Sequence, residues 1–357
     1  MKATDIWTIR PLADPRAVIR GEGYRITVLT DRMLRLEYDP GNRFRDTATQ
    51  MALCREFPVP EYTVEETEQW LGVETEHVRL RYNRGPFSVT GLSAELKGAY
   101  AVYASVWHYG DTLKTLGGTA RTLDEADGEI PLEDGILSAS GYAVLDDSAS
   151  MEMDETGCLL PARFSEKDLY LFAYGHDFRA AIRDYLRLSG SVPVVPRFAL
   201  GNWWSRFYAY SQQEYMQLME RFQREEIPLS VSVLDMNWHV TDIDPKYGSG
   251  WTGYSWDREK FPDPEKLLTW LHAQGLKVTL NDHPADGVRP FEDLYPQMAE
   301  AMGEDPADGK SFPFDAANEK MIRAMEDTVI SAQEKMGVDF WWLDWQQQGG
   351  RSGRAHV

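Results

Sequence analysis

Short runs of β-branched and aromatic residues mark the first half of the chain, and turn-forming residues separate them. Pro40-Gly41, Asp127-Gly128 and Asp134-Gly135 are examples of these turn formers. Runs with such spacing are typical of antiparallel strands joined by turns. The runs predicted as strands are YRITVLT, MLRLEY, HVRLRYN, FSVTGLSAEL and DLYLFAYG. The pattern predicts a β-sandwich over residues 1–190.

A helical stretch over residues 178–188 is followed by the proline-bearing segment SVPVVPRF. Pro193 and Pro196 cannot donate hydrogen bonds to a β-ladder, so the segment is unsuited to the middle of a sheet. We therefore expect the domain boundary here, with domains at 1–190 and 191–357.

After Pro196 the pattern changes to strands that alternate with helices. Ser211 and Glu214 form a capping-box pattern before the first helix. Pro264 opens the second helix, which ends near Gly275. The last helix is expected from about residue 318 to residue 337. The four predicted strands are FALGNWW (198–204), LSVSVLD (229–235), LKVTL (276–280) and VDFWWLD (338–344).

Four successive parallel strands fit either a doubly wound sheet or half of a (β/α)₈ barrel. Long connections follow the second and third strands, and no Gly-x-Gly-x-x-Gly follows the first, which favours the barrel. A whole barrel takes about 250 residues, more than the stretch after Pro196 provides. We therefore expect a β-sandwich followed by an incomplete (β/α)₈ TIM barrel, consisting of the first four β/α units of a truncated domain.

The charge excludes several classes of partner. With 37 basic and 57 acidic side chains the chain has a net charge of −20, so we expect no nucleic-acid partner and no docking on an anionic membrane. The amino terminus lacks the apolar run of a signal peptide, which predicts a soluble, cytoplasmic protein. Cys54 and Cys158 are too few for a disulfide scaffold. The oligomeric state stays open.

Two of the predicted parallel strands end in an aspartate, Asp235 and Asp344. Side chains alternate along a strand, so both carboxylates can cap the barrel interior. Nine of the twelve tryptophans lie between residues 203 and 345, and an indole ring suits stacking on a sugar as well as core packing. Carboxylates between aromatic rings fit glycoside hydrolysis. The alternative is that these are loop aspartates that accept backbone hydrogen bonds.

The stretch VDFWWLDWQQ resembles the nucleophile motif of glycoside hydrolase family 31, the α-glucosidase and α-xylosidase family. Further segments resemble the first three barrel strands of that family in the same order: PRFALGNWWSRFYAYS, VSVLDMNWH and FPDPEKLLTWLHAQGLKVTLNDHPADG. VLTDRMLRLEYDP, LGGTARTLDEADG and ILSASGYAVLDDS resemble its amino-terminal, galactose mutarotase-like sandwich.

The resemblance implies a retaining α-glycosidase that acts on terminal α-linked glucose or xylose, with an oligosaccharide or α-glycoside as substrate. It implies Asp344 as the catalytic nucleophile and Asp235 as an acceptor for sugar hydroxyls. It also implies that Trp342, His283 and Phe207 line the subsite of the sugar that is cleaved off. No cofactor is expected, and the absence of His-x-His or His-x-x-x-His spacing disfavours a metal.

The sequence also departs from the family pattern. The acid/base of the family is an aspartate on a later barrel strand, which these residues do not include. Gln346–Gln348 give three glutamines where two are expected, and the tail GGRSGRAHV no longer resembles the family. We expect a chain that is inactive alone, with a frameshift or gene-model error as one explanation of the tail. Transglycosylation and a non-catalytic carbohydrate-binding fragment are the alternatives.

Overall fold

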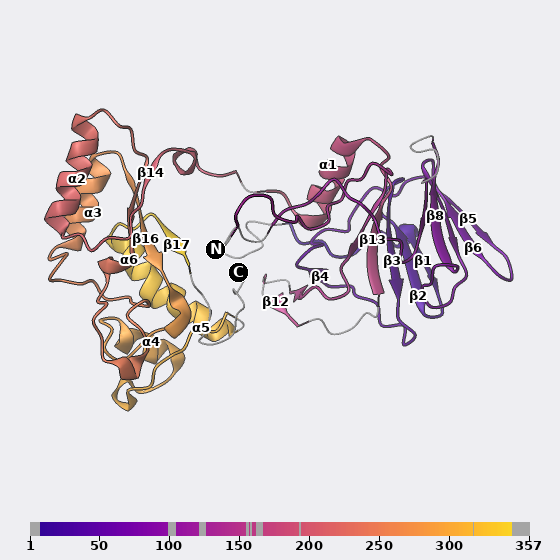
Figure 1. Cartoon of the computed structure of the whole chain (residues 1–357). Helices are drawn as coiled ribbons and strands as arrows, with labels where there is room; N and C mark the ends of the chain where they lie inside the picture. Colours follow the sequence, from indigo (N-terminus) through magenta and orange to yellow (C-terminus); the bar gives the residue numbers. More distant parts are fainter. Residues whose placement is uncertain are drawn as a thin grey trace. The chain divides into compact units, whose positions relative to one another are not determined.

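The computed structural model describes residues 8–98, 105–120, 126–154, 157, 159–161, 167–192, 194–316 and 318–344. The chain divides into two compact units, Met1–Pro193 and Val194–Val357 (Figure 1). The division falls inside the proline-bearing segment, three residues after the predicted boundary.

The N-terminal unit is β-rich, as predicted. Its two larger sheets are antiparallel, and buried side chains of both, Leu36 and Leu80 among them, form one hydrophobic core. This is the arrangement of a sandwich. The first sheet has the order β1 (Val18–Gly21), β2 (Tyr24–Val28), β3 (Met33–Tyr38), β13 (Lys167–Phe172), β10 (Ala143–Asp146). The second has the order β5 (Thr63–Glu66), β6 (Leu71–Glu74), β7 (Val78–Tyr82), β8 (Leu92–Leu96), β9 (Val106–His108).

A smaller sheet and a helix complete the unit. The small sheet has the order β12 (Leu159–Leu160), β11 (Glu152–Met153), β4 (Ala48–Thr49). Helix α1 (Phe178–Ser189) packs its Ala181 and Leu188 against Met33 and Phe172 of the first sheet. The prediction of one strand over FSVTGLSAEL was wrong in its first half, because Ser88 and Gly91 close a turn through a 3.0 Å backbone hydrogen bond.

The face of the first sheet opposite the sandwich core holds buried ion pairs. Arg35 donates to both carboxylate oxygens of Asp168, at 2.8 and 2.7 Å, and lies 3.1 Å from Glu37. Glu37 also accepts two hydrogen bonds from Arg25. The side chains of Arg35, Glu37 and Asp168 are at most 3% exposed. Burial favours the neutral carboxyl group, but Arg35, together with the charges of Arg55 and Arg45, outweighs it and the pKa of Asp168 is lowered.

The C-terminal unit contains a four-stranded parallel sheet. Helices α2 (Gln212–Arg224) and α3 (Pro264–Ala273) cover one of its faces (Figure 1). Tyr215 of α2 and Leu267 of α3 pack there against Val278 and Leu280 of the sheet. The order is β14 (Trp203–Trp204), β15 (Val231–Leu234), β16 (Lys277–Asp282), β17 (Phe340–Leu343). The alternation of strands and helices is the one expected from the sequence.

The predicted last helix runs from its N-cap Asn318 to Gly337, but its middle is wider than an α-helix. It consists of α5 (Glu319–Ala324), the π-helical η8 (Met325–Ile330) and α6 (Ser331–Met336). Helix α4 (Tyr295–Met302) packs beside it. In the described part of the chain the short 3₁₀ helices are η2 (Pro15–Ala17), η3 (Arg197–Leu200), η4 (Met236–Trp238), η5 (Pro245–Tyr247), η6 (Pro284–Asp286) and η7 (Pro306–Asp308).

The first predicted strand, FALGNWW, is mostly not a strand. Its first half belongs to η3, in which Gly201 N–H bonds to the Phe198 carbonyl, and only Trp203–Trp204 pair with β15. The ring of Phe198 lies 5.5 Å from that of Phe340 on β17. An apolar run cannot distinguish a strand from a packed turn, which explains the error.

The predicted capping box is present at the N-terminus of α2. The Ser211 hydroxyl accepts from Glu214 N–H, and the Glu214 carboxylate accepts from Ser211 N–H at 2.8 Å. Ser211→Ala is expected to lower the free energy of unfolding by about 1 kcal/mol, because a backbone donor loses its partner. Urea unfolding followed by circular dichroism measures this. Gln213→Ala, an exposed position of the same turn, is the control, and equal midpoints for the two variants would contradict the role of the cap.

Candidate active site

The carboxyl ends of three parallel strands meet along one edge of the C-terminal sheet. Leu234 pairs with Leu280, and Asn281 pairs with Trp342, so β15, β16 and β17 end at about the same level. Asp344 N–H donates to the Asp282 carbonyl at 2.9 Å and extends this ladder. The residues that follow the strands therefore come together at this edge.

The two faces of the strands differ in chemistry. Leu234, Leu280 and Trp341 pack toward the helices. By the two-residue period of a strand, Asp235, His283 and Asp344 belong to the opposite face. Aspartates and a histidine thus share the end of the sheet face that the two helices leave uncovered.

His283 and Asp344 approach one another at this edge. Nε2 of His283 lies 3.9 Å from Oδ2 of Asp344; the histidine side chain is 4% exposed and the aspartate side chain 40%. Burial lowers the pKa of His283, although the negative charges of Asp344 and Asp235 oppose this shift. The imidazole is therefore neutral near pH 7. Within the part of the chain described, its Nδ1 and Oδ1 of Asn281 are buried without a hydrogen-bond partner.

Asp235 has a structural role in addition to its charge. It is the N-cap of η4, where its Oδ1 accepts from Met236 N–H at 2.7 Å. This hydrogen bond is the one expected from the alternative interpretation, in which a loop aspartate accepts from the backbone. Because a carboxylate has a second oxygen, the cap does not prevent Asp235 from accepting a hydroxyl group of a ligand.

Phe207 and Trp342 were also predicted to line the site. Phe207 follows β14 and is 68% exposed. Trp342 is half-buried on β17. Among the residues that the structure describes, no ring contact connects either of them with His283. Their roles at the site stay predictions.

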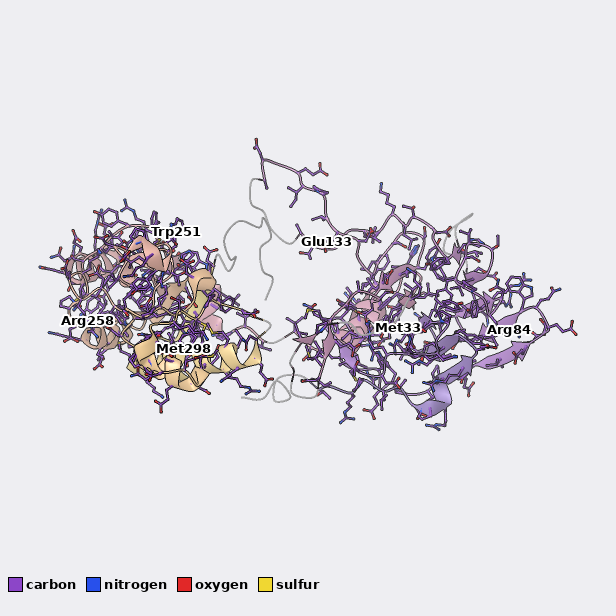
Figure 2. The ribbon with its side chains drawn as sticks, turned by 90° about the horizontal axis from the view of Figure 1, so that it is seen from below. Met33, Arg84, Glu133, Trp251, Arg258 and Met298 are labelled. Atoms are coloured by element: carbon purple, nitrogen blue, oxygen red, sulfur yellow. The ribbon has the colours of Figure 1, made fainter. Side chains whose placement is uncertain are left out.

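Trp251, which was not among the residues predicted for the site, lies against His283. The two rings are 5.3 Å apart with an interplanar angle of 83°. Trp251, labelled in Figure 2, is 51% exposed. It lies in the long connection between β15 and α3. The signal that could have identified Trp251 is the Gly- and Trp-rich stretch GSGWTGYSW, in the loop that follows β15.

Asp282, beside His283 in the sequence, faces the opposite way. It is buried and accepts a hydrogen bond from the Tyr254 hydroxyl at 3.0 Å. Burial raises the pKa of Asp282 to about 7; the negative charge of Glu326 adds to the shift and the bond from Tyr254 opposes it. Asp282 therefore keeps a proton in the folded chain at pH values where the unfolded chain has lost it.

This raised pKa predicts a dependence of stability on pH. Folded Asp282 binds more protons than unfolded Asp282 between about pH 4 and 7, so its contribution to the free energy of unfolding falls as the pH rises through that window. Asp282→Asn removes the titration, and we expect the variant to gain about 2 kcal/mol relative to wild type between pH 5 and 8. Urea unfolding at both pH values measures the difference. A constant difference would contradict the assignment.

One group of possible metal ligands occurs in the described part of the chain. Ligand atoms of Asp31, Glu76 and His77 lie within 4.8 Å of one another in the N-terminal unit. Arg32 Nη2 lies 3.0 Å from Nε2 of His77, one of the three possible ligands. A positive charge at this place disfavours metal binding.

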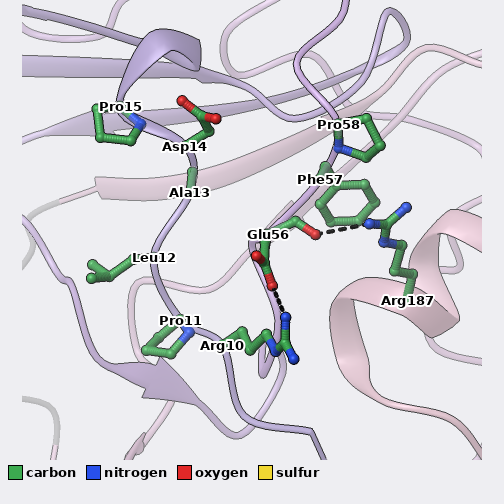
Figure 3. A pocket seen from close by; sticks show the side chains of 10 residues that line it. All are labelled: Arg10, Pro11, Leu12, Ala13, Asp14, Pro15, Glu56, Phe57, Pro58 and Arg187. Atoms are coloured by element: carbon green, nitrogen blue, oxygen red, sulfur yellow. Dashed lines mark hydrogen bonds and ion pairs between the residues drawn. The ribbon is translucent and has the colours of Figure 1, made fainter.

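A shallow depression of about 740 Å³ in the N-terminal unit is lined by the segments 10–15 and 56–58 and by Arg187 (Figure 3). Arg10 forms an ion pair with Glu56. Arg187 donates to the Glu56 carbonyl at 3.0 Å, and its guanidinium lies 4.5 Å from the ring centre of Phe57. These charged groups are engaged with one another, which argues against a second reactive centre there.

Comparisons with known proteins relate the C-terminal unit to a family of glycosyl hydrolases. Residues 192–353 match the TIM-barrel domain of glycosyl hydrolases family 31. An α-xylosidase of Saccharolobus solfataricus is 26% identical over 232 residues, which cover 64% of this chain and 30% of that protein. The family match takes in less than half of the chain and lies almost wholly in the C-terminal unit. An α-xylosidase of Lactiplantibacillus pentosus, XylQ, is 26% identical over 226 residues, 60% of this chain and 28% of that protein.

Solved structures of family 31 share the fold. A family 31 α-xylosidase from a soil metagenome, complexed with xylose, has a TM-score of 0.61 at 16% identity, covering 94% of this chain and 57% of that one. A family 31 dextranase of Flavobacterium johnsoniae, complexed with glucose, has a TM-score of 0.59 at 16% identity, covering 91% and 45%. The neighbours support a β-rich domain followed by a TIM-barrel domain. The chain spans less than a third of the length of the two curated relatives.

The remaining predictions concern membrane spans, the two cysteines and the C-terminal tail. No described helix has the length and apolar character needed to cross a bilayer. Cys54 is a free thiol, whereas Cys158 lies outside the described residues. Gln346–Gln348 and the tail GGRSGRAHV also lie outside them.

Proposed function

We propose that this chain is a member of glycoside hydrolase family 31 that cleaves terminal α-linked glucose or xylose with retention of configuration. The observation that carries the proposal is the position of Asp344. Its carboxylate is 40% exposed at the carboxyl end of β17, and a buried, neutral imidazole lies 3.9 Å away. In a TIM barrel, this end of the strands is where catalytic residues occur.

Asp344 acts as the nucleophile. One of its oxygens forms a bond to the anomeric carbon while the bond from that carbon to the leaving oxygen breaks, and the product is a glycosyl ester. Water then attacks the same carbon, releases the carboxylate and restores the original configuration. A protonated His283 would pair with the Asp344 carboxylate. The neutral imidazole leaves the charge of this carboxylate available for the sugar.

Asp235 binds the sugar. Its second carboxylate oxygen accepts from a sugar hydroxyl, and such hydrogen bonds to a charged acceptor are strong. Phe207 and Trp342 supply apolar surface for the pyranose ring. The two carboxylates carry out these roles without a cofactor.

Turnover of ordinary glycosides needs a second carboxyl group that protonates the leaving oxygen. Asp235, which caps η4 and binds the sugar, is not assigned that role. We therefore expect the 357 residues alone to react poorly with substrates whose leaving group requires a proton.

A substrate with a leaving group that needs no proton tests the proposal. α-D-Glucosyl fluoride and α-D-xylosyl fluoride are incubated with the full chain, fluoride release is measured, and quenched samples are mapped by mass spectrometry. We expect release of fluoride and a glycosyl adduct on the peptide that contains Asp344. The faster of the two fluorides indicates the sugar preference.

The other outcomes decide among the alternatives. Transfer of the sugar to an added acceptor in preference to water would indicate a transglycosylase. Saturable sugar binding in a titration, without fluoride release, would indicate a non-catalytic carbohydrate-binding chain. An adduct on a different carboxylate would overturn the role of Asp344.

A further inference from the structure

Two buried, oppositely charged side chains connect the long β15–α3 loop to the segment after β16. Arg289 has a side chain only 1% exposed and donates through Nη1 to the carbonyls of Ser249 at 3.0 Å and Tyr247 at 3.3 Å. Its Nη2 donates to the carbonyl of Thr252. Arg289 thus binds the loop backbone on both sides of Trp251.

Glu292 completes the connection. Its Oε1 accepts from Arg289 Nη2 at 3.0 Å, and its Oε2 accepts from Tyr254 N–H at 3.1 Å and from the Ser255 hydroxyl at 2.8 Å. Its side chain is also 1% exposed. Asp286 adds a contact at the rim, because its Oδ2 accepts from Ser249 N–H at 3.0 Å.

The loop between these contacts is tightly closed. Nε2 of His239 lies 3.2 Å from the carbonyl of Trp251 itself. A β-carbon at Gly253 would lie 2.1 Å from Nδ1 of His239, and one at Gly250 would lie 1.9 Å from the carbonyl of Thr241. Only glycine fits at these two positions, so the backbone that carries Trp251 has little room to shift.

We propose that Arg289 and Glu292 are positioning residues that hold the Trp251 ring against His283, as an apolar platform for a pyranose of the α-glycoside. The inference rests on the proposed function for the identity of the ligand. Trp251 presents a half-exposed ring at the edge where Asp344 lies, and indole faces bind the C–H surface of sugars. The cluster itself is too buried to touch the substrate.

The position of Trp251 can be measured without a sugar. A protonated imidazole quenches the fluorescence of an indole in contact with it. The fluorescence of Trp251 is obtained as the difference between the emission of wild type and that of Trp251→Phe. It is followed while the pH is lowered through the range in which His283 takes up a proton. The groups around His283 in this titration are Asp344, Asp235 and the ring of His239. We expect quenching in wild type and its loss in Arg289→Met.

The matched control is Arg221→Met, which removes an exposed guanidinium paired with Glu225 on α2. It should leave the quenching unchanged. Arg289→Lys keeps a hydrogen-bond donor and should retain part of the quenching. This variant replaces Arg289→Met if circular dichroism shows that Arg289→Met does not fold. Full quenching in either folded Arg289 variant would overturn the proposal.

A double-mutant cycle tests the link to the sugar. Adduct formation with the α-glycosyl fluoride is expected to slow about tenfold or more in Arg289→Met and in Trp251→Ala. If Arg289 acts through Trp251, the double variant is no slower than the slower single one; if Arg289 has only a general structural role, the two effects multiply. Multiplying effects would overturn the proposal. A wild-type chain that forms no adduct would refute the proposed function, while the fluorescence measurement would still decide the positioning.

Discussion

Replacing Asp344 with asparagine is expected to abolish fluoride release from an α-glycosyl fluoride, with a rate loss on the order of 10⁴-fold or more. An amide has nearly the same shape as a carboxylate but is a very poor nucleophile toward the anomeric carbon. Fluoride leaves without a proton, so the measurement reports on the nucleophile and not on the general acid. Asp242→Asn, an exposed carboxylate of the β15–α3 loop, is the control and should retain the rate of wild type.

The nature of the product in a rescue experiment strengthens this test. Asp344→Gly leaves a space at the end of β17, and added azide can attack the anomeric carbon from the face that the carboxylate occupied. We expect azide to restore fluoride release and to give a glycosyl azide of inverted configuration. A product of retained configuration, or full activity of Asp344→Asn without azide, would show that another group is the nucleophile.

The positions of Asp235 and Asp344 were predictable because they depend on local patterns. Parallel strands that end at a common level bring the following residues to one edge, and the run of apolar residues before each aspartate marks the strand. Trp251 and Arg289 were not predictable in the same way. Their roles depend on contacts between two loops, and no residue period records which carbonyl a guanidinium will reach.

The fold shows the same division between local and tertiary information. MLRLEY was recognised as a strand, and its alternation of Leu34 and Leu36 with Arg35 and Glu37 is the pattern of a strand with one face in water. The structure buries the charged face instead, because Asp168 on the neighbouring strand pairs with Arg35. The pattern of alternation is the same whether polar side chains are solvated or paired in the interior.

Arg35→Met is expected to lower the free energy of unfolding of the N-terminal unit by about 3–5 kcal/mol. The methionine fills similar space but leaves Asp168 without its bidentate partner, and Glu37 loses one of its two arginines. Amide hydrogen exchange of β13 measures the loss within this unit. Arg79→Met, which removes an exposed ion pair with Glu74, should cost much less, because solvent screens the two charges. Equal costs for the two variants would contradict the importance of the buried pair.

The loss in Arg35→Met should also depend on pH, with a sign that identifies its cause. In wild type the lowered pKa of Asp168 contributes stability above the ordinary carboxyl range, and this contribution is lost as the pH falls. Without Arg35, only Arg45 and Arg55 oppose the effect of burial, so the pKa of Asp168 rises and the stability that its ionised form contributes at higher pH shrinks. The difference between the two proteins should therefore be largest near pH 7 and shrink toward pH 4. A difference that does not change with pH would indicate lost packing as the cause, because a cavity or a misplaced methionine has no proton to exchange.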